Sequence, residues 1–133
     1  MAIPLFNLIG SRAIKRGLTY NRFTISLPGN KTAWIPRGSI RDNYKEDGGN
    51  LLVEWRFDTA PAYDSEADTT TFFPELTPED TTSELLPPTI LQSETKPPRV
   101  GTAYLTDFEF ENPDNGKVIG SEVVWVQVKK EVT

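Results

Sequence analysis

Three acidic side chains at alternate positions, Asp64, Glu66 and Asp68, are the first group in this sequence that could do chemistry. Hard cations such as Ca²⁺ bind several oxygen ligands gathered around one point, and an alternating acidic loop can supply such ligands. No glycine-bearing calcium loop of the usual length surrounds the three carboxylates. We therefore favour a solvated acidic loop, and we predict that the chain binds no metal ion and no cofactor.

Two pairs of carboxylates raise the question of glycoside hydrolysis, which needs one acid to protonate the leaving group and a second as nucleophile or base. The pairs are Glu109 with Glu111, and Glu54 with Asp58. Acidic strand faces are common, however, and neither pair comes with a supporting motif. The sequence contains no histidine and no cysteine, which excludes Ser–His and Cys–His catalysis. We predict that the protein is not an enzyme.

The three tryptophans, Trp34, Trp55 and Trp125, have side chains that could stack on sugar rings. Trp55 and Trp125 fall on strand faces that are inward or mixed, so both are better interpreted as core residues. Trp34 lies next to a turn and is the one plausible exposed tryptophan. A glycan-binding surface is therefore an alternative that depends on Trp34.

The basic residues are concentrated in the first half of the chain, although the formal net charge is −5. Residues 1–56 carry nine basic and four acidic side chains, whereas residues 57–95 carry nine acidic and no basic ones. Folding could interleave these segments, or the surface could be dipolar and suit a copy of the chain or a complementary neighbour. The net negative charge and the lack of an aromatic and basic stripe argue against nucleic-acid binding.

The clearest structural pattern is a long antiparallel hairpin over residues 104–128. On the first arm Tyr104, Thr106, Phe108 and Phe110 share one face, and on the second Val124, Val126 and Val128 do so. Side chains alternate between faces along a strand, so this pattern is typical of half-buried strands. Asn115 and Gly116, between the arms, can adopt the positive φ angles of a tight turn. A chain with such a hairpin is expected to be all-β.

Further strands are predicted over residues 18–27, 39–44 and 51–59, and Pro36 should exclude the residues around it from a central ladder position. Residues 60–71 read as an acidic loop, after which Phe72 and Phe73 begin a short strand. Thr77 can cap a short helix within residues 77–85, with Pro78 at its first position and Asp80 three after the cap. Two proline pairs predict an exposed connector over residues 86–99.

Together these elements predict an immunoglobulin-like antiparallel β-sandwich of about seven strands with one short helix. A single domain over residues 14–133 would follow an N-terminal arm, residues 1–13, and carry the proline-rich insert at 86–99. No apolar run approaches eighteen residues, so no membrane span is expected. The predicted core consists of Phe23, Ile25, Ile40, Val53, Trp55, Phe57, Phe108, Val124 and Val126.

The order of several short motifs supports a more specific expectation. A Lys15-Arg16-Gly17 step opens the first strand, Gly38 precedes the second, and Leu76-Thr77-Pro78-Glu79 starts the helix. The last hairpin then supplies a further set: Tyr104, Phe108, Asn115, Gly116, Gly120 and residues 124–128. In this order, over residues 14–133, the chain resembles the small immunoglobulin-like domain found at the N-terminus of tailed-phage baseplate upper proteins and as separate tail proteins. The arm, the long 60–71 loop and the 86–99 insert depart from that family.

The resemblance implies a structural virion protein of a tail or baseplate, made in the host cytoplasm, that attaches a fibre or a neighbouring subunit. Its partners would be other tail or baseplate proteins and copies of itself. The alternative is a carbohydrate- or surface-binding β-sandwich module.

The two unusual segments and the basic residues between them are the predicted partner-binding residues. They are Ile3, Pro4, Leu5, Phe6, Leu8, Ile9, Arg12, Lys15, Arg16, Pro87, Pro88, Ile90 and Leu91. The apolar arm needs cover, because an isolated domain has little reason to leave such a strip in water. A partner could supply that cover, or the arm could pair as an edge strand within its own domain.

Overall fold

The computed structural model describes residues 2–43, 48–89 and 104–129, and this part of the chain is an all-β sandwich, as predicted. Its elements are η1 (Gly10–Arg12), β1 (Ile14–Lys15), β2 (Ile25–Pro28), β3 (Ile35–Arg41), β4 (Leu51–Glu54), β5 (Ala62–Asp64), β6 (Thr69–Phe72), α1 (Pro78–Thr81), β7 (Tyr104–Glu111), β8 (Val118–Gly120), β9 (Val124–Val126) and β10 (Val128–Lys129). These ranges hold ten strands rather than about seven, because several strands are only two or three residues long. Within the same ranges no helix is long and apolar enough to cross a membrane.

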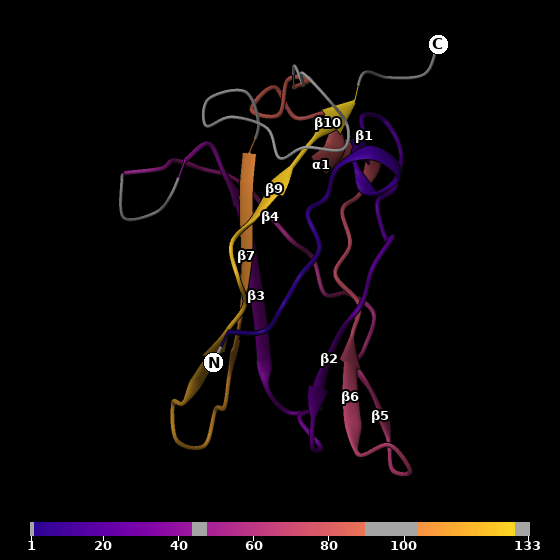
Figure 1. The fold of residues 1–133 in the computed structure, drawn as a ribbon, viewed down its shortest axis with the longest axis vertical. Helices are drawn as coiled ribbons and strands as arrows, with labels where there is room; N and C mark the ends of the chain where they lie inside the picture. Colours follow the sequence, from indigo (N-terminus) through magenta and orange to yellow (C-terminus); the bar gives the residue numbers. More distant parts are fainter. Residues whose placement is uncertain (1, 44–47, 90–103, 130–133) are drawn as a thin grey trace.

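Two sheets face each other, and a third pair of strands closes one end. The larger sheet has the order β4-β3-β7-β8, with β9 also paired to β7, and the smaller sheet has the order β2-β6-β5. Strands β1 and β10 form a separate parallel pair. Figure 1 shows β3 and β7 on one side, β2, β5 and β6 on the other, and β1, β10 and α1 at the upper end.

Aromatic rings fill the space between the two sheets. The ring centroids of Phe72 and Phe110 are 4.7 Å apart, and Phe108 lies 5.4 Å from Trp55 and 5.7 Å from Phe23. The buried Trp55 indole donates a hydrogen bond to the Thr106 hydroxyl (2.8 Å), which satisfies its only polar group. All nine predicted core residues are buried or half-buried, so the predicted core is confirmed.

The predicted C-terminal hairpin is confirmed, although its second arm is divided into β8, β9 and β10. The turn is closed by two backbone hydrogen bonds of 2.8 Å, from Asn112 to the Lys117 carbonyl and from Gly116 to the Asn112 carbonyl. Gly116 has φ +74°, whereas Asn115 keeps a negative φ. The turn therefore uses one left-handed residue instead of two.

Pro36 lies inside a strand, so the prediction that this strand begins at residue 39 is wrong. The carbonyl of Gly38 accepts from Trp55 N–H (2.9 Å), so the even-numbered residues of β3 turn their backbone groups toward β4. Strand β4 pairs only with Ser39–Arg41 and does not reach Pro36. The backbone nitrogen of Pro36 therefore lies on the β4 side of β3, at a position that β4 does not reach, so the lack of an N–H there costs no ladder hydrogen bond.

The predicted acidic loop, residues 60–71, is instead a hairpin made by β5 and β6. Its turn uses the acids themselves: the Asp64 carboxylate accepts from the N–H groups of Glu66 (3.0 Å) and Ala67 (3.3 Å). Asp68 has φ +50° and accepts a hydrogen bond from the Tyr63 hydroxyl (2.7 Å). Two of the three acids weighed as cation ligands therefore support a turn.

The predicted strand over residues 18–27 is also shorter than expected, because β2 covers only Ile25–Pro28. Tyr20 instead forms an isolated bridge with Leu76, just before α1. The helix itself is confirmed. Thr77 and Asp80 form a reciprocal capping box, with Pro78 at the first helical position.

Candidate functional site

The N-terminal arm, defined here as residues 2–9, lies parallel to residues 120–127 of the same chain. Four backbone hydrogen bonds join the two segments: Ile3 N–H to Gly120 O (3.0 Å), Glu122 N–H to Ile3 O (2.8 Å), Leu8 N–H to Trp125 O (2.8 Å) and Gln127 N–H to Leu8 O (2.8 Å). The arm therefore pairs within its own domain, which is one of the two alternatives left open by the sequence.

Side-chain hydrogen bonds fasten the arm as well. The Asn7 side-chain oxygen Oδ1 accepts from the backbone N–H of Trp125 (3.0 Å), and the Gln127 side-chain oxygen Oε1 accepts from the backbone N–H of Gly10 (2.8 Å). These contacts of Asn7 and Gln127 were not predicted. The sequence does contain a pattern that points to them, because each is a single polar residue inside an otherwise apolar stretch. Gln127 is buried in the fold, and buried polar side chains are normally hydrogen-bonded.

The six predicted partner-binding residues of the arm differ in how far they are exposed to solvent. Leu8 is 3% exposed and belongs to the core of its own chain, which leaves it inaccessible to a partner. Ile3 and Leu5 are half-buried against that core, and Ile9 is half-buried as well. Phe6 is 72% exposed, and Pro4 is exposed too. Only the outward part of the arm is thus accessible as a docking element.

We call the group made by the exposed residues Pro4, Phe6 and Arg12 the arm surface. The Arg12 guanidinium lies 4.5 Å from the centre of the Phe6 ring, in a cation–π contact that restricts the ring. Beside the Phe6 ring is a small pocket of about 110 Å³ lined by Pro4, Leu5, Phe6, Leu8, Arg12, Phe23, Thr24, Thr106, Phe108 and Val124. An exposed ring beside a mainly apolar pocket is suited to contact with another apolar surface.

The predicted basic residues have different roles. Lys15 lies directly across from Lys129 in the β1–β10 pair, which places two like charges side by side. Arg16 instead donates to three backbone carbonyls in the segment after α1: Thr82 (3.0 Å), Ser83 (3.1 Å) and Leu86 (2.5 Å). Arg16 is therefore a structural residue, and Lys15 is half-buried, whereas Arg12 is exposed.

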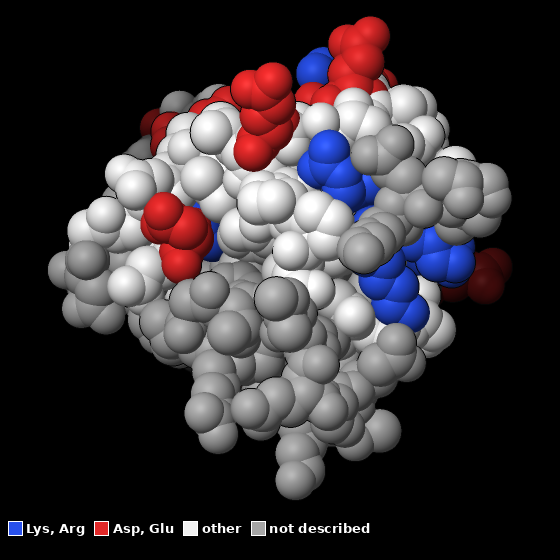
Figure 2. All heavy atoms as spheres, turned by 90° about the horizontal axis from the view of Figure 1, so that it is seen from above, with Lys and Arg blue, Asp and Glu red and all other residues white. Residues whose placement is uncertain are grey.

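The charge asymmetry of the sequence is partly retained in the fold. Seen from above, several basic side chains gather on the right of the view, while acidic side chains lie at the left and along the top, with one more behind the basic group (Figure 2). The acidic turn between β5 and β6 lies at the other end of the sandwich (Figure 1). Folding also interleaves the charges, because Arg37 pairs with Glu109 (3.5 Å) and Glu111 (3.0 Å). This pairing engages both members of one carboxylate pair weighed above as catalytic.

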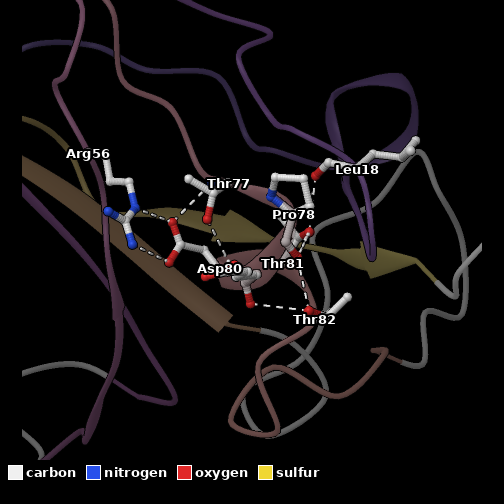
Figure 3. A network of polar contacts seen from close by, with 8 residues as sticks. Leu18, Arg56, Thr77, Pro78, Asp80, Thr81 and Thr82 are labelled. Carbon is white, nitrogen blue, oxygen red and sulfur yellow. Dashed lines mark hydrogen bonds and ion pairs between the residues drawn. The ribbon is translucent and has the colours of Figure 1, made fainter.

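A network of polar contacts fixes α1 (Figure 3). The Arg56 guanidinium donates to both oxygens of Asp80, at 2.6 and 3.1 Å, and the hydrogen bond from Arg56 is the main cause that lowers the pKa of the Asp80 carboxyl. The buried Thr81 hydroxyl donates to the Leu18 carbonyl (3.0 Å). These contacts hold α1 beside β4.

A groove of about 540 Å³ lies between β4 and α1, lined by Leu52, Val53, Glu54, Trp55, Arg56, Glu79, Asp80 and Ser83. A second groove of about 340 Å³ lies on the outer face of the larger sheet, lined by Pro36, Arg37, Gly38, Ser39, Arg41, Leu51, Glu54, Trp55, Asp107 and Glu109. Glu54 and Trp55 border both grooves. Strand β4 is thus accessible from two sides.

The proline-rich segment is described only as far as residue 89. Leu86 is fully buried, so the exposed connector predicted from residue 86 begins after it. Pro87 and Pro88 are exposed, and the Pro87 carbonyl accepts from the Tyr104 hydroxyl (2.7 Å). The predicted partner residues Ile90 and Leu91 lie outside the described residues.

Trp34, the candidate for stacking on a sugar, is half-buried. The Lys31 ammonium group lies 5.3 Å from the centre of its ring, so the ring already has a cationic partner. Across residues 2–43, 48–89 and 104–129, no three acidic side chains gather where they could hold a metal ion.

No protein-family model matches this sequence, and no curated protein matches it significantly. The fold class therefore follows from the structure alone, and the class of function must be argued from the arm surface.

Proposed function

We propose that this protein is a structural virion component of a phage tail or baseplate, which attaches a fibre or a neighbouring subunit through protein–protein contacts. The observation that carries the proposal is the arm surface. Its central ring, Phe6, is 72% exposed although the backbone of the arm is hydrogen-bonded to the domain on both sides of it.

The energetics of association favour such a surface. Burying a phenylalanine side chain fully contributes on the order of 1.5–3 kcal/mol. The backbone of the arm is already ordered, so little further entropy is lost when a partner covers Phe6. Pre-ordered aromatic residues beside small apolar pockets are typical of the few residues that dominate binding energy at an interface.

The proposed partners are other tail or baseplate proteins and copies of the same chain, with the virion as location. The proposal includes no catalytic activity and no nucleic-acid binding. The absence of histidine and cysteine and the Arg37 pairing of Glu109 and Glu111 support the first of these, and the net charge of −5 supports the second. No observation on the described residues favours the glycan-binding alternative.

The test is a single substitution, Phe6→Ser, followed by native mass spectrometry of the purified chain and by a pull-down of tail or baseplate particles. Leu85→Ser is the matched control, because Leu85 is 55% exposed and belongs to the segment after α1 rather than to the arm. We expect Phe6→Ser to abolish self-association or particle binding while Leu85→Ser retains both. Equal binding by the two variants, or saturable glycan binding by a wild-type monomer, would contradict the proposal.

A further inference from the structure

Among the described residues, no strand pairs with the outer edge of β4 at Glu54. Just after β4, Arg56 and Glu75 form an antiparallel bridge with two backbone hydrogen bonds of 2.9 Å. If this antiparallel pairing continued, the next pair would lie two residues back from Arg56 and two residues on from Glu75. Glu54 would then pair with Thr77. Thr77 is instead the N-cap of α1, and the chain turns away.

Strand β4 is consequently the last strand of the larger sheet within the described part of the chain. Trp55 donates its backbone N–H to Gly38 of β3, and backbone groups of successive residues point to opposite edges of a strand. The N–H and C=O of Glu54 therefore point away from β3, to the same edge as those of Arg56. The groove of about 540 Å³ lies along this edge. Its far wall, α1, is held in place by the Arg56–Asp80 pair. The groove therefore occupies the position of a missing strand.

The charge of the groove indicates which partner fits. Three carboxylates, Glu54, Glu79 and Asp80, and one guanidinium, Arg56, line it. Arg56 is paired with Asp80, and no hydrogen bond or ion pair joins the side chains of Glu54 and Glu79 to other described residues. Arg56 also attracts Glu79, which leaves three carboxylates against one guanidinium in the groove lining, and a cationic segment would balance this net negative charge.

We propose that β4 accepts an extended, basic segment of a partner protein as an added strand in this groove. Main-chain hydrogen bonds to Glu54 would provide the pairing, as in other recognition by strand addition. Glu54 is exposed while Val53 is half-buried against the core, so the matching segment alternates Lys or Arg with a branched apolar residue. This site is separate from the arm surface and does not depend on the proposed function.

The probe is the peptide acetyl-Lys-Val-Lys-Val-Lys-Val-Lys-amide, added to the full chain at low salt. Binding is followed by calorimetry, and the exchange of backbone amides with solvent is followed residue by residue by NMR. We expect saturable binding, with slower exchange at the Glu54 amide than in the protein alone.

Two controls separate strand pairing from simple charge attraction. A peptide of the same sequence with every backbone amide N-methylated keeps its charge but cannot donate a ladder hydrogen bond from either edge, and we expect it to bind at least about tenfold more weakly. The double variant Glu54→Lys/Glu79→Lys should lose about tenfold or more in affinity. The matched variant Glu66→Lys/Asp114→Lys makes the same change in net charge in two exposed turns, and its affinity should stay within about twofold of the wild type.

Each outcome bears on the proposal. Loss of affinity in the groove variant and with the methylated peptide, together with protection at Glu54, supports it. Equal binding of the methylated peptide would overturn strand addition, and equal binding by both protein variants would overturn the assignment to the groove. No binding of the unmodified peptide would also overturn it, and would mean that the short, acidic edge acts to prevent strand pairing.

Discussion

Gly38 lies directly across the β3–β7 ladder from Phe108, and the Phe108 ring occupies the space that a Cβ atom on Gly38 would need. A Cβ at this position would lie 2.4 Å from the nearest ring carbon of Phe108 and 3.0 Å from a ring carbon of Trp55. The glycine is required here by the close approach of an aromatic core, because its backbone φ is not left-handed.

Gly38→Ala is therefore expected to destabilise the protein. Forcing a methyl group against a packed ring typically costs about 1–3 kcal/mol, since the ring and backbone must shift. Gly120→Ala is the control, because nothing lies within 4 Å of a Cβ built there. Urea denaturation measures both free energies of unfolding. Similar values for the two variants would show that the Phe108 ring moves aside without cost.

One buried residue of the arm and one exposed residue give a second prediction. Leu8 is 3% exposed, so Leu8→Ala should lower the free energy of unfolding by about 2–5 kcal/mol. Phe6 is 72% exposed, so Phe6→Ala should change it by less than about 0.5 kcal/mol. Thermal or urea unfolding of the two variants checks this. Large effects for both would mean that Phe6 also serves the core.

Arg16 is predicted to stabilise the segment after α1. Its guanidinium donates to the carbonyls of Thr82, Ser83 and Leu86. Hydrogen bonds from charged groups contribute about 1.5–3 kcal/mol, so Arg16→Ala should cost about that amount, and Arg16→Lys should cost less than alanine. Arg22→Ala, an exposed arginine nearby in sequence, is the control. If it costs as much as Arg16→Ala, the three carbonyl contacts do not contribute.

Asp80 should make the stability depend on pH in the acidic range. The pKa of its carboxyl lies below the ordinary value of 3.8 in the folded protein, chiefly because the Arg56 guanidinium is hydrogen-bonded to the carboxylate. The folded state consequently binds fewer protons than the unfolded state. This contribution to stability is present above pH 3.8 and is lost as the pH falls through the lower, folded-state pKa.

The variant Asp80→Asn tests this dependence. At neutral pH it should lose about 1 kcal/mol, a value reduced by the partial exposure of the pair. Its free energy of unfolding should then fall less steeply than that of the wild type below pH 3.8. Asp114→Asn, in the exposed hairpin turn, should leave the wild-type curve unchanged. Identical curves for wild type and Asp80→Asn would contradict the assignment.

Local signals in the sequence predicted the structure well. The capping box of Thr77 and Asp80 is confirmed, because it depends on residues three positions apart. The alternation from Thr106 to Phe110 is confirmed as well, because it follows a simple period of two, whereas Leu105 is buried although it lies on the other face. The resemblance to phage domains remains an expectation and underlies the proposed function.

Features set by distant parts of the chain could not be predicted. Pro36 fits inside β3 only because β4 ends before it. The β5–β6 hairpin, by contrast, is a local feature, and it was missed because its turn is built from acids rather than glycine. Of the candidate docking residues, Leu8 is buried by residues more than a hundred positions away, which no local pattern reveals.

The pairing of the arm with residues 120–127, and of β1 with β10, has a consequence for how the protein is made. A ribosome synthesises Ile3, Leu8 and Ile14 more than a hundred residues before the segment 120–128 that holds their backbone hydrogen-bonding partners. Until then Leu8 and Ile14, both buried in the final fold, remain uncovered on the nascent chain. Contacts of such long sequence separation form slowly, so the sandwich is expected to close only after residue 129 has left the ribosome.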